Sequence, residues 1–288
     1  MNEQPRKKVG LALSGGFVRA TAAIGVIEVL RMHRIPIDMI SGCSAGAGVA
    51  GAYVNGQLES MKHRLVNTTR WDYFHTIIEP TIPREGLLKG KRTREFFKLY
   101  AGDKNFEDLD IPFFVTATDL NTLSPVVLNT GKIHHAIQAS VGVPGLWMPV
   151  KWQGMILSDG GNFYQIPSAP LYDHGADYVI ALDTTKPPNF IIRMLSAWYQ
   201  KYGKDKKLEE KIFTDNRSVL ELVKRAVYLS TVRMENFYHS SYRYDTLIQP
   251  KVSEFKRWHV KKIADIIEEG RRAAEEMVPK IKKDLGLE

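Results

Sequence analysis

Three observations predict an α/β fold with a mainly parallel central sheet. Strand-like and helix-like segments alternate over residues 9–54, as in parallel strands joined by covering helices. Further β-rich runs recur up to residue 182, and from residue 186 the sequence becomes charge-rich and helical. We therefore expect a single domain, with a core over residues 1–185 and a helical C-terminal extension over residues 186–288 that packs on this core.

The first elements of this fold are the clearest in the sequence. Val9–Leu13 is a short apolar run typical of a buried strand, and Ser14-Gly15-Gly16 ends it. Apolar residues then recur at helical spacing over residues 19–33. Ile37–Ile40 predicts a second strand, and the small residues of Ala45–Val54 predict a closely packed helix.

The later elements follow the same two patterns. Residues 58–110 are predicted to be mostly helical, and so is Ile133–Ser140. The other β-rich runs are Ile111–Thr118, Val126–Asn129, Met155–Leu157 and Tyr178–Leu182, which is the last clear strand. One face of a C-terminal helix is apolar, which favours packing on the core. This face carries Ile263, Ile266, Ile267, Ala274, Met277 and Ile281.

Composition and charge narrow the class of protein. Of 288 residues, 44% are hydrophobic and 25% charged, which is ordinary for a globular protein and argues against wholesale disorder. The single cysteine, Cys43, excludes an intramolecular disulfide and fits a reducing compartment. No signal peptide and no apolar run of about 20 residues is visible, so we expect a cytoplasmic protein. The net charge of +8 suits an anionic membrane surface or nucleic acid, but no nucleic-acid-binding signature is present, and we expect no nucleic-acid partner.

Gly42-Cys43-Ser44-Ala45-Gly46 has the form G-x-S-x-G. It lies between a predicted strand and a predicted helix, which is the context of a nucleophile elbow. Glycines at 42 and 46 let the strand and helix approach closely, and the helix N-terminus beneath Ser44 favours developing negative charge. The motif predicts Ser44 as a nucleophile; a Gly/Ser-rich turn without chemistry is the alternative.

Ser14-Gly15-Gly16-Phe17-Val18-Arg19 also joins a strand to a helix. Its glycines present consecutive backbone N–H groups at a helix start, an arrangement that binds anions. In an acyl hydrolase the anion is the tetrahedral oxyanion, and each donor contributes roughly 3–4 kcal/mol. Arg19 either adds charge at the site or fixes the loop. A phosphate loop is disfavoured, because Gly15-Gly16 matches neither nucleotide-binding motif.

A serine nucleophile needs a base to remove its proton. None of the histidines lies in a loop that plainly ends a strand; they are His33, His63, His75, His134, His135, His174, His239 and His259. Asp159 does end a predicted strand, before the tight turn Gly160-Gly161, and Asp119 and Asp183 are its competitors. Because the pKa of a free aspartate is about 3.9, water exclusion and a preorganised oxyanion hole would have to assist such a base.

Together these motifs resemble the patatin-like phospholipase family, in particular its bacterial branch akin to neuropathy target esterase. That family has, in this order, a G-G-G-x-R-G oxyanion loop, a G-x-S-x-G elbow and a D-G-G/A motif. Here the three read as residues 15–20, residues 42–46 and Asp159-Gly160-Gly161. The stretches Phe114–Leu120 and Ala139–Gly145 are also similar, and the resemblance extends over about residues 9–183.

The resemblance implies a three-layer α/β/α fold and a Ser44–Asp159 dyad that works without metal or cofactor. It also implies hydrolysis of fatty-acyl esters such as phospholipids or lysophospholipids. The residues that it implies for the oxyanion hole are the backbone of Gly15, Gly16 and Phe17, with Arg19 in support.

Two departures from the family pattern keep alternatives open. Phe17 replaces the third glycine of the loop and Ala20 the last; if φ at residue 17 is positive, its N–H is misplaced and the hole holds fewer donors. A non-catalytic lipid-binding protein and an α/β-hydrolase with a Ser–His–Asp triad are the alternative functions. The apolar segment 190–202 is either a lid or membrane-contact helix, giving peripheral contact with a membrane, or a core helix.

Overall fold

The computed structural model describes residues 6–82, 86–122, 124–162, 165–185 and 243–287. The segment 190–202, for which the sequence leaves a lid, a membrane contact or a core helix open, lies outside the described residues.

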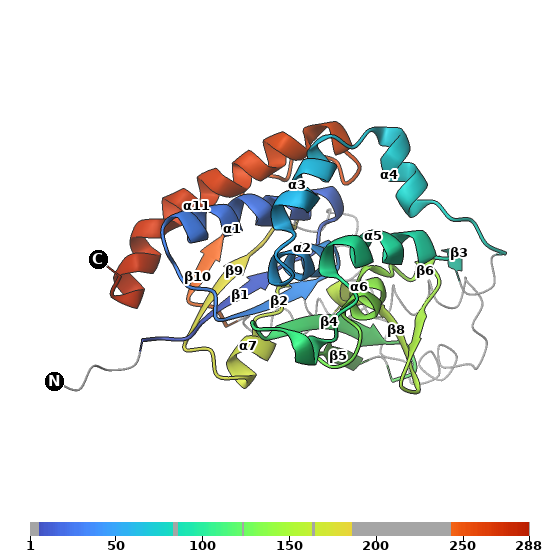
Figure 1. The fold of residues 1–288 in the computed structure, drawn as a ribbon, viewed down its shortest axis with the longest axis horizontal. Helices are drawn as coiled ribbons and strands as arrows, with labels where there is room; N and C mark the ends of the chain where they lie inside the picture. Colours follow the sequence, from blue (N-terminus) through green and yellow to red (C-terminus); the bar gives the residue numbers. More distant parts are fainter. Residues whose placement is uncertain (1–5, 83–85, 123, 163–164, 186–242, 288) are drawn as a thin grey trace, which may run out of the picture.

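A mostly parallel sheet runs through the molecule (Figure 1). Hydrogen bonds link its strands in the order β10-β9-β1-β2-β4-β8-β7, and β5 also pairs with β4. Strands β10, β9, β1, β2 and β4 run parallel, whereas β5 and β8 are antiparallel to β4, and β7 is antiparallel to β8. The strands are β1 (Val9–Leu13), β2 (Met39–Cys43), β4 (Phe113–Asp119), β5 (Ser124–Leu128), β7 (Val150–Trp152), β8 (Met155–Asp159), β9 (Tyr178–Leu182) and β10 (Thr246–Ile248). A separate parallel pair is formed by β3 (Gly86–Leu88) and β6 (Gly145–Trp147).

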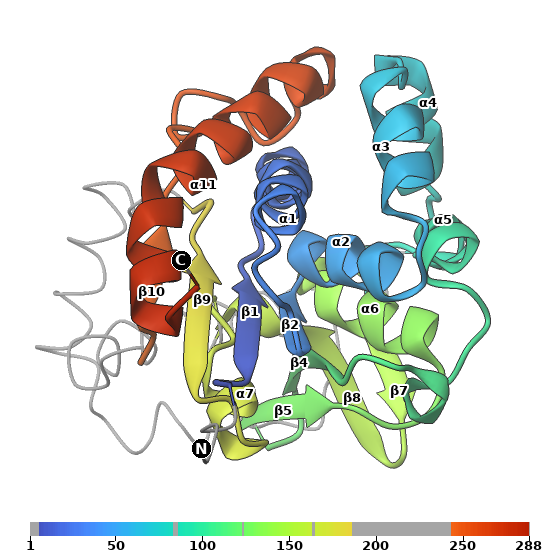
Figure 2. The ribbon, with the colours of Figure 1, turned by 60° about the vertical axis from the view of Figure 1, so that its left-hand side comes forward.

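Helices cover both faces of this sheet, so the expected three-layer α/β/α fold is confirmed. Figure 2 shows α1, α2, α6 and α11 on one side and α7 on the other. The larger apolar core fills the first interface, and a smaller one lies under α7. The helices are α1 (Ala22–Met32), α2 (Ala45–Val54), α3 (Leu58–Val66), α4 (Arg70–Ile77), α5 (Lys91–Ala101), α6 (Ile133–Val141), α7 (Ala169–Asp173) and α11 (Ile263–Leu285), with short 3-10 turns η1 (Phe17–Thr21), η2 (Phe106–Asp108), η3 (Gly160–Asn162) and η4 (Val260–Lys262).

The long helix α11 lies along α1, as its apolar face predicts. Ile263, Ile266, Ile267, Ala274 and Ile281 are buried in the larger core, and Met277 packs against it half-buried. The two helices cross at glycines, since a Cβ atom on Gly25 would meet the carbonyl oxygen of Ile267 and one on Gly270 would meet that of Ala22. Close backbone contact therefore joins the C-terminal helix to the first helix of the core.

The structure differs from the sequence prediction at several elements. The strand predicted over Ile37–Ile40 is shifted to Met39–Cys43, and β6, β7 and α7 are not predicted. Tyr178–Leu182 is not the last strand, because β10 pairs with it from beyond residue 242. Three residues in β conformation are too short a run to stand out from a helical region. The helix predicted over residues 19–33 begins as the 3-10 turn η1, and β8 continues through Ser158 to Asp159.

Strands β2 and β8 meet end to end along one edge of β4. The antiparallel strand β5 occupies the other edge, pairing from Val115 to Asp119. On the shared edge β2 ends with Cys43 opposite Thr116, and β8 ends with Asp159 opposite Ala117. Two strands that run toward each other thus deliver residues 44 and 159 to neighbouring positions.

Candidate active site

Ser44 occupies a sharp turn between β2 and α2. Its backbone has φ 51° and ψ −129°, a conformation that costs a non-glycine residue roughly 1–3 kcal/mol and that turns the side chain away from both elements. Glycines make the turn possible. A Cβ atom on Gly42 would meet the backbone of Ala47, and one on Gly46 would meet the carbonyl oxygen of Ser14.

The hydroxyl of Ser44 donates a hydrogen bond to Asp159 Oδ2 at 2.8 Å. The other carboxylate oxygen, Oδ1, accepts the backbone N–H of Gly161 at 2.6 Å, which orients the carboxylate toward Ser44. Asp159 is only 9% exposed. A Cβ atom on Gly160 would meet the carbonyl of Thr116, so the turn after Asp159 requires glycine at this position.

The C-terminal end of α6 holds both members of this pair. The backbone N–H of Ser44 donates to Ser140 Oγ at 2.7 Å, and the Ser140 hydroxyl donates to the carbonyl of Thr116 at 2.7 Å. Two residues later, the carbonyl of Gly142 accepts the backbone N–H of Asp159 at 2.9 Å. One short segment therefore fixes the nucleophile turn and the carboxylate together.

The glycine loop after β1 lies directly against Ser44. A Cβ atom on Gly15 would stand 3.0 Å from Ser44 Cβ and 3.7 Å from its Oγ. Thr184 fixes the loop, because its hydroxyl donates to the Gly15 carbonyl at 2.6 Å and its N–H donates to Ser14 Oγ at 2.9 Å. Within the described part of the chain, the N–H groups of residues 15, 16 and 17 donate to no acceptor. These N–H groups therefore remain available to take an anion beside Ser44.

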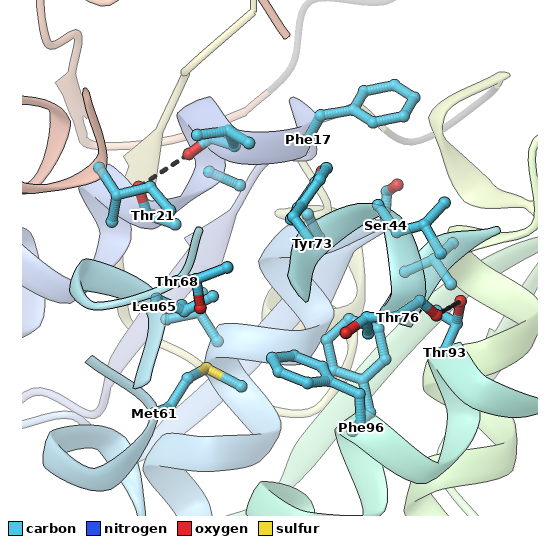
Figure 3. Close-up of a pocket in the computed structure, with 18 of the residues that line it drawn as sticks. Phe17, Thr21, Ser44, Met61, Leu65, Thr68, Tyr73, Thr76, Thr93 and Phe96 are labelled. Atoms are coloured by element: carbon cyan, nitrogen blue, oxygen red, sulfur yellow. Dashed lines mark hydrogen bonds between the residues drawn. The ribbon is translucent and has the colours of Figure 1, made fainter. Parts of the chain in front are cut away.

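An apolar pocket extends from Ser44 between α2, α3, α4 and α5. Figure 3 places Ser44 at one end of the view and Met61 and Leu65 at the other, with Tyr73 and Phe96 between them. The other lining residues are also mostly apolar, and they include Val49, Phe97, Val141, Trp147 and Ile263. Such a lining suits a hydrocarbon chain.

A sequence profile of the patatin-like phospholipase family matches residues 11–172, more than half of the 288-residue chain. The chain belongs to the patatin-like phospholipase family. The match includes the glycine loop, the Ser44 turn and Asp159.

The relatives of this patatin-like protein include proteins of the neuropathy target esterase (NTE) family. An uncharacterised NTE family protein of Mycobacterium bovis is 34% identical over 175 residues, which cover 61% of this chain and 48% of that protein. A protein named lysophospholipase NTE1, from Scheffersomyces stipitis, is 29% identical over 184 residues, which cover 61% of this chain and 12% of that protein. The match thus spans less than half the length of either relative. The structure of VipD from Legionella pneumophila aligns with 96% of this chain and 67% of that chain, at 12% identity and a TM-score of 0.44.

The patatin-like protein departs from the family loop at Phe17, whose φ is +56°. A non-glycine residue in this left-handed region of backbone conformation lowers the stability of the fold by roughly 1–2 kcal/mol. The ring of Phe17 packs edge-on against Trp258 with centroids 4.8 Å apart, and the Arg257 guanidinium lies 5.6 Å from its centroid. The segment before α11 thus anchors the strained residue. From the sequence, a positive φ at residue 17 is expected to misplace the N–H group of Phe17. The N–H groups of Gly15 and Gly16 are therefore the stronger candidates for the oxyanion hole.

Arg19 does not reach the pocket. It is buried, and its Nε and Nη1 form no hydrogen bond with the residues that the structure describes. Burial, followed by the charge of Arg257, lowers the pKa of Arg19, while Asp183 acts in the opposite direction. Its backbone N–H donates to the Gly16 carbonyl at 3.2 Å. The position of Arg19 fits a role in fixing the loop better than one in adding charge beside Ser44.

The competing carboxylates have local structural roles. Asp119 accepts the backbone N–H groups of Asn121 and Ile156, and Asp183 accepts the N–H and hydroxyl of Thr185. No histidine of the described residues lines the pocket. The described residues also contain no cluster of histidine, cysteine or acidic side chains arranged to hold a metal ion.

Sequence reasoning missed Ser140 and Thr184. Ser140 lies inside a predicted helix, and the only signal for it is the family-like stretch Ala139–Gly145. Thr184 carries no motif at all, because its contact with the Gly15 loop joins residues 169 positions apart.

Proposed function

We propose that this protein is a serine acyl hydrolase that cleaves fatty-acyl esters, such as those of phospholipids or lysophospholipids, through a Ser44–Asp159 dyad. The 2.8 Å hydrogen bond from Ser44 Oγ to Asp159 Oδ2 is the observation that carries the proposal. The relatives support the substrate class, since one of them is named a lysophospholipase.

In the proposed reaction Asp159 accepts the Ser44 proton as Oγ attacks the ester carbonyl. The N–H groups of Gly15 and Gly16 stabilise the oxyanion, and this electrostatic assistance offsets the weakness of a carboxylate base. The C–O bond to the alcohol breaks, the alcohol takes the proton from Asp159, and an acyl-enzyme remains. Water then attacks the acyl carbonyl and gives a proton to Asp159. The bond to Ser44 Oγ breaks as Asp159 passes this proton to Ser44, and the fatty acid leaves.

The apolar pocket supports an acyl chain rather than a polar acyl group. Its walls beyond Ser44 are formed by Val49, Phe96 and Phe97, and Met61 lies toward its far end. Burying each CH₂ group of an acyl chain contributes about 0.8 kcal/mol. We therefore expect turnover of p-nitrophenyl esters at low concentration to rise with acyl length until the pocket is full.

The test compares wild type with Ser44→Ala and Ser60→Ala on a p-nitrophenyl acyl ester and on a lysophospholipid. Ser60 is exposed on α3, so Ser60→Ala is the same substitution at a position away from the pocket. Ser44→Ala is expected to abolish release of both products while circular dichroism stays that of the wild type, and Ser60→Ala is expected to keep full turnover. Unchanged turnover by Ser44→Ala would overturn the proposed function.

A further inference from the structure

The helix α4 carries apolar side chains on two opposite faces. Tyr73, Thr76 and Ile77 point inward and line the pocket beside Ser44. Trp71, Phe74 and Ile78 recur at helical spacing on the other side, where they face solvent. A surface helix of a globular protein ordinarily has one apolar face. Within the described part of the chain, the rings of Trp71 and Phe74 contact ring neighbours on α4 itself, His75 and Tyr73, and the outer apolar face stays exposed.

This outer face is large and strongly exposed. Trp71 is 72% exposed, Phe74 and Ile78 are each 42% exposed, and Ile82 just beyond the helix is 73% exposed. Figures 1 and 2 show α4 at the periphery of the molecule, with no described element over that side. Contiguous exposed apolar residues of this kind mark an interaction surface, and tryptophan is enriched where proteins meet the membrane–water interface.

The charges around this face are basic. Arg64, Arg70, Lys89 and Lys91 are exposed and form no ion pair with the residues that the structure describes. The acids of the same region are engaged locally. Glu95 on α5 pairs with Arg94 at 3.3 Å, and Asp72 and Glu79 are half-buried. Asp72 accepts the N–H and hydroxyl of Thr69 in the N-terminal cap of α4. Glu79 accepts the backbone N–H of Arg92 at 3.0 Å. The outward field beside the apolar stripe is therefore positive and matches an anionic lipid surface.

We propose that the outer face of α4, formed by Arg70, Trp71, Phe74 and Ile78, docks the protein on an anionic lipid bilayer. The aromatic and aliphatic side chains enter the headgroup region while the unpaired cations contact lipid phosphates. The inner face of the same helix is a wall of the pocket, and the exposed Arg64 on α3 lies at the rim where the pocket reaches the surface. Docking by α4 thus brings one wall of the pocket to the bilayer surface. The proposed function enters this inference at one point, namely that a lipid ester must reach Ser44.

The contacts of α4 fit a docking element rather than a core helix. None of the eight residues of α4, all of which the structure describes, is buried. On the inner side, the ring of Tyr73 lies 6.3 Å from that of Trp258, which in turn packs on Phe17 of the glycine loop. The helix is therefore attached through its pocket-facing side and leaves the outer side free for a bilayer.

The test measures vesicle binding separately from catalysis. The full chain carrying Ser44→Ala, so that lipid is not consumed, is sedimented with phosphatidylcholine vesicles with or without phosphatidylglycerol. We expect binding to the phosphatidylglycerol vesicles, weakening with salt, and a drop in partitioning of about tenfold or more when Trp71→Ser and Phe74→Ser are added. The matched control is Met32→Ser, another strongly exposed apolar residue, at the end of α1.

Activity and oligomeric state complete the test. In the wild-type background, neither Trp71→Ser/Phe74→Ser nor Met32→Ser is expected to change turnover of a short, soluble p-nitrophenyl ester, which shows that the fold is intact. Equal vesicle binding by all variants would overturn the docking surface, and so would equal binding to vesicles without anionic lipid. A wild-type dimer that becomes monomeric with Trp71→Ser/Phe74→Ser would also overturn it, because the face would then be an interface between two copies of the chain. A protein that binds vesicles but hydrolyses nothing would contradict the proposed function and leave the docking surface standing.

Discussion

At the scale of single residues, Ser140 shows how the strained turn at Ser44 is held. The turn leaves the backbone N–H of Ser44 pointing into the protein, where a donor without an acceptor costs about 1–3 kcal/mol. The buried Ser140 Oγ accepts this N–H and its hydroxyl donates a hydrogen bond to the carbonyl of Thr116. Ser140 is therefore a positioning residue for the nucleophile.

Removing the Ser140 hydroxyl is expected to cost more than removing that of Ser158, an equally buried serine. Ser140→Ala leaves the N–H of Ser44 without a partner, so we expect a loss of about 1–3 kcal/mol in the free energy of unfolding. Ser158 donates to the carbonyl of Gly142, which also accepts the N–H of Asp159, so Ser158→Ala leaves that carbonyl satisfied and is expected to cost about 1 kcal/mol. Urea unfolding measures both. A larger loss for Ser158→Ala contradicts this interpretation.

The residues of the site differ in how far the sequence predicts them. Ser44 and Asp159 each belong to a local motif whose glycines are visible in the sequence, and the structure brings the two side chains together. Phe17 shows the limit of local reasoning. The sequence identifies it as an exception in a glycine loop, but its packing on Trp258 depends on a segment about 240 positions away.

At the scale of elements, the meeting of β2 and β8 on one edge of β4 creates the site. The sequence predicts both strands, but it does not predict that β8 runs antiparallel, because a five-residue run carries no information about its partner or direction. Asp159 nevertheless lies beside the carboxyl end of the parallel strand β2, because it pairs with Ala117, the residue after the partner of Cys43. The carboxylate reaches Ser44 because β8 approaches β4 from the opposite end.

The crossing of α1 and α11 predicts that Gly270→Ala destabilises the protein. Alanine favours an isolated helix by about 1 kcal/mol over glycine. Here its Cβ would overlap the carbonyl oxygen of Ala22, and separating the helices costs more than this gain, so we expect a net loss of about 1–3 kcal/mol. Glu276→Ala on the exposed side of α11 is the control and is expected to change stability by less than about 0.5 kcal/mol. Chemical unfolding of both variants checks this, and a Gly270→Ala protein more stable than wild type rules out the close crossing.

At the scale of the whole molecule, Glu28 ties three helices together. Glu28 lies on α1, and its carboxylate accepts hydrogen bonds from Lys62 Nζ of α3 at 2.5 Å and from Arg271 Nε of α11 at 2.8 Å. Burial raises the pKa of Glu28, but the hydrogen bonds from Lys62 and Arg271 outweigh burial and hold that pKa below its ordinary value of 4.5. A carboxylate with a lowered pKa in the folded state stabilises the protein above its unfolded-state pKa, and this contribution is lost as pH falls through the folded-state pKa.

Glu28→Gln is therefore expected to lower the free energy of unfolding by about 2 kcal/mol at neutral pH. The difference from wild type should shrink as pH falls below 4.5, where the unfolded chain takes up the proton first, and should vanish once the pH is below the lowered pKa of Glu28 in the folded protein. Unfolding in urea at a series of pH values measures this. Glu59→Gln, an exposed neighbour 3.6 Å from the same lysine, is the control and should have little effect at any pH. A Glu28→Gln difference that stays constant down to low pH contradicts the role of the carboxylate.

The described helices also bear on how the protein could meet a membrane. Among the helices of the described residues, none is long and apolar enough to cross a bilayer. On the surface, α4 joins an exposed apolar face to the wall of the pocket.

The most direct test of the account is covalent labelling of the full chain with a fluorophosphonate, with the modified residue located by mass spectrometry. Labelling requires an activated serine and needs no knowledge of the natural substrate. We expect the adduct on Ser44, and we expect Asp159→Asn, which keeps the size of the side chain but cannot accept the proton, to slow labelling by about a hundredfold or more. An adduct on another serine, or labelling of Asp159→Asn at the wild-type rate, would contradict the Ser44–Asp159 dyad.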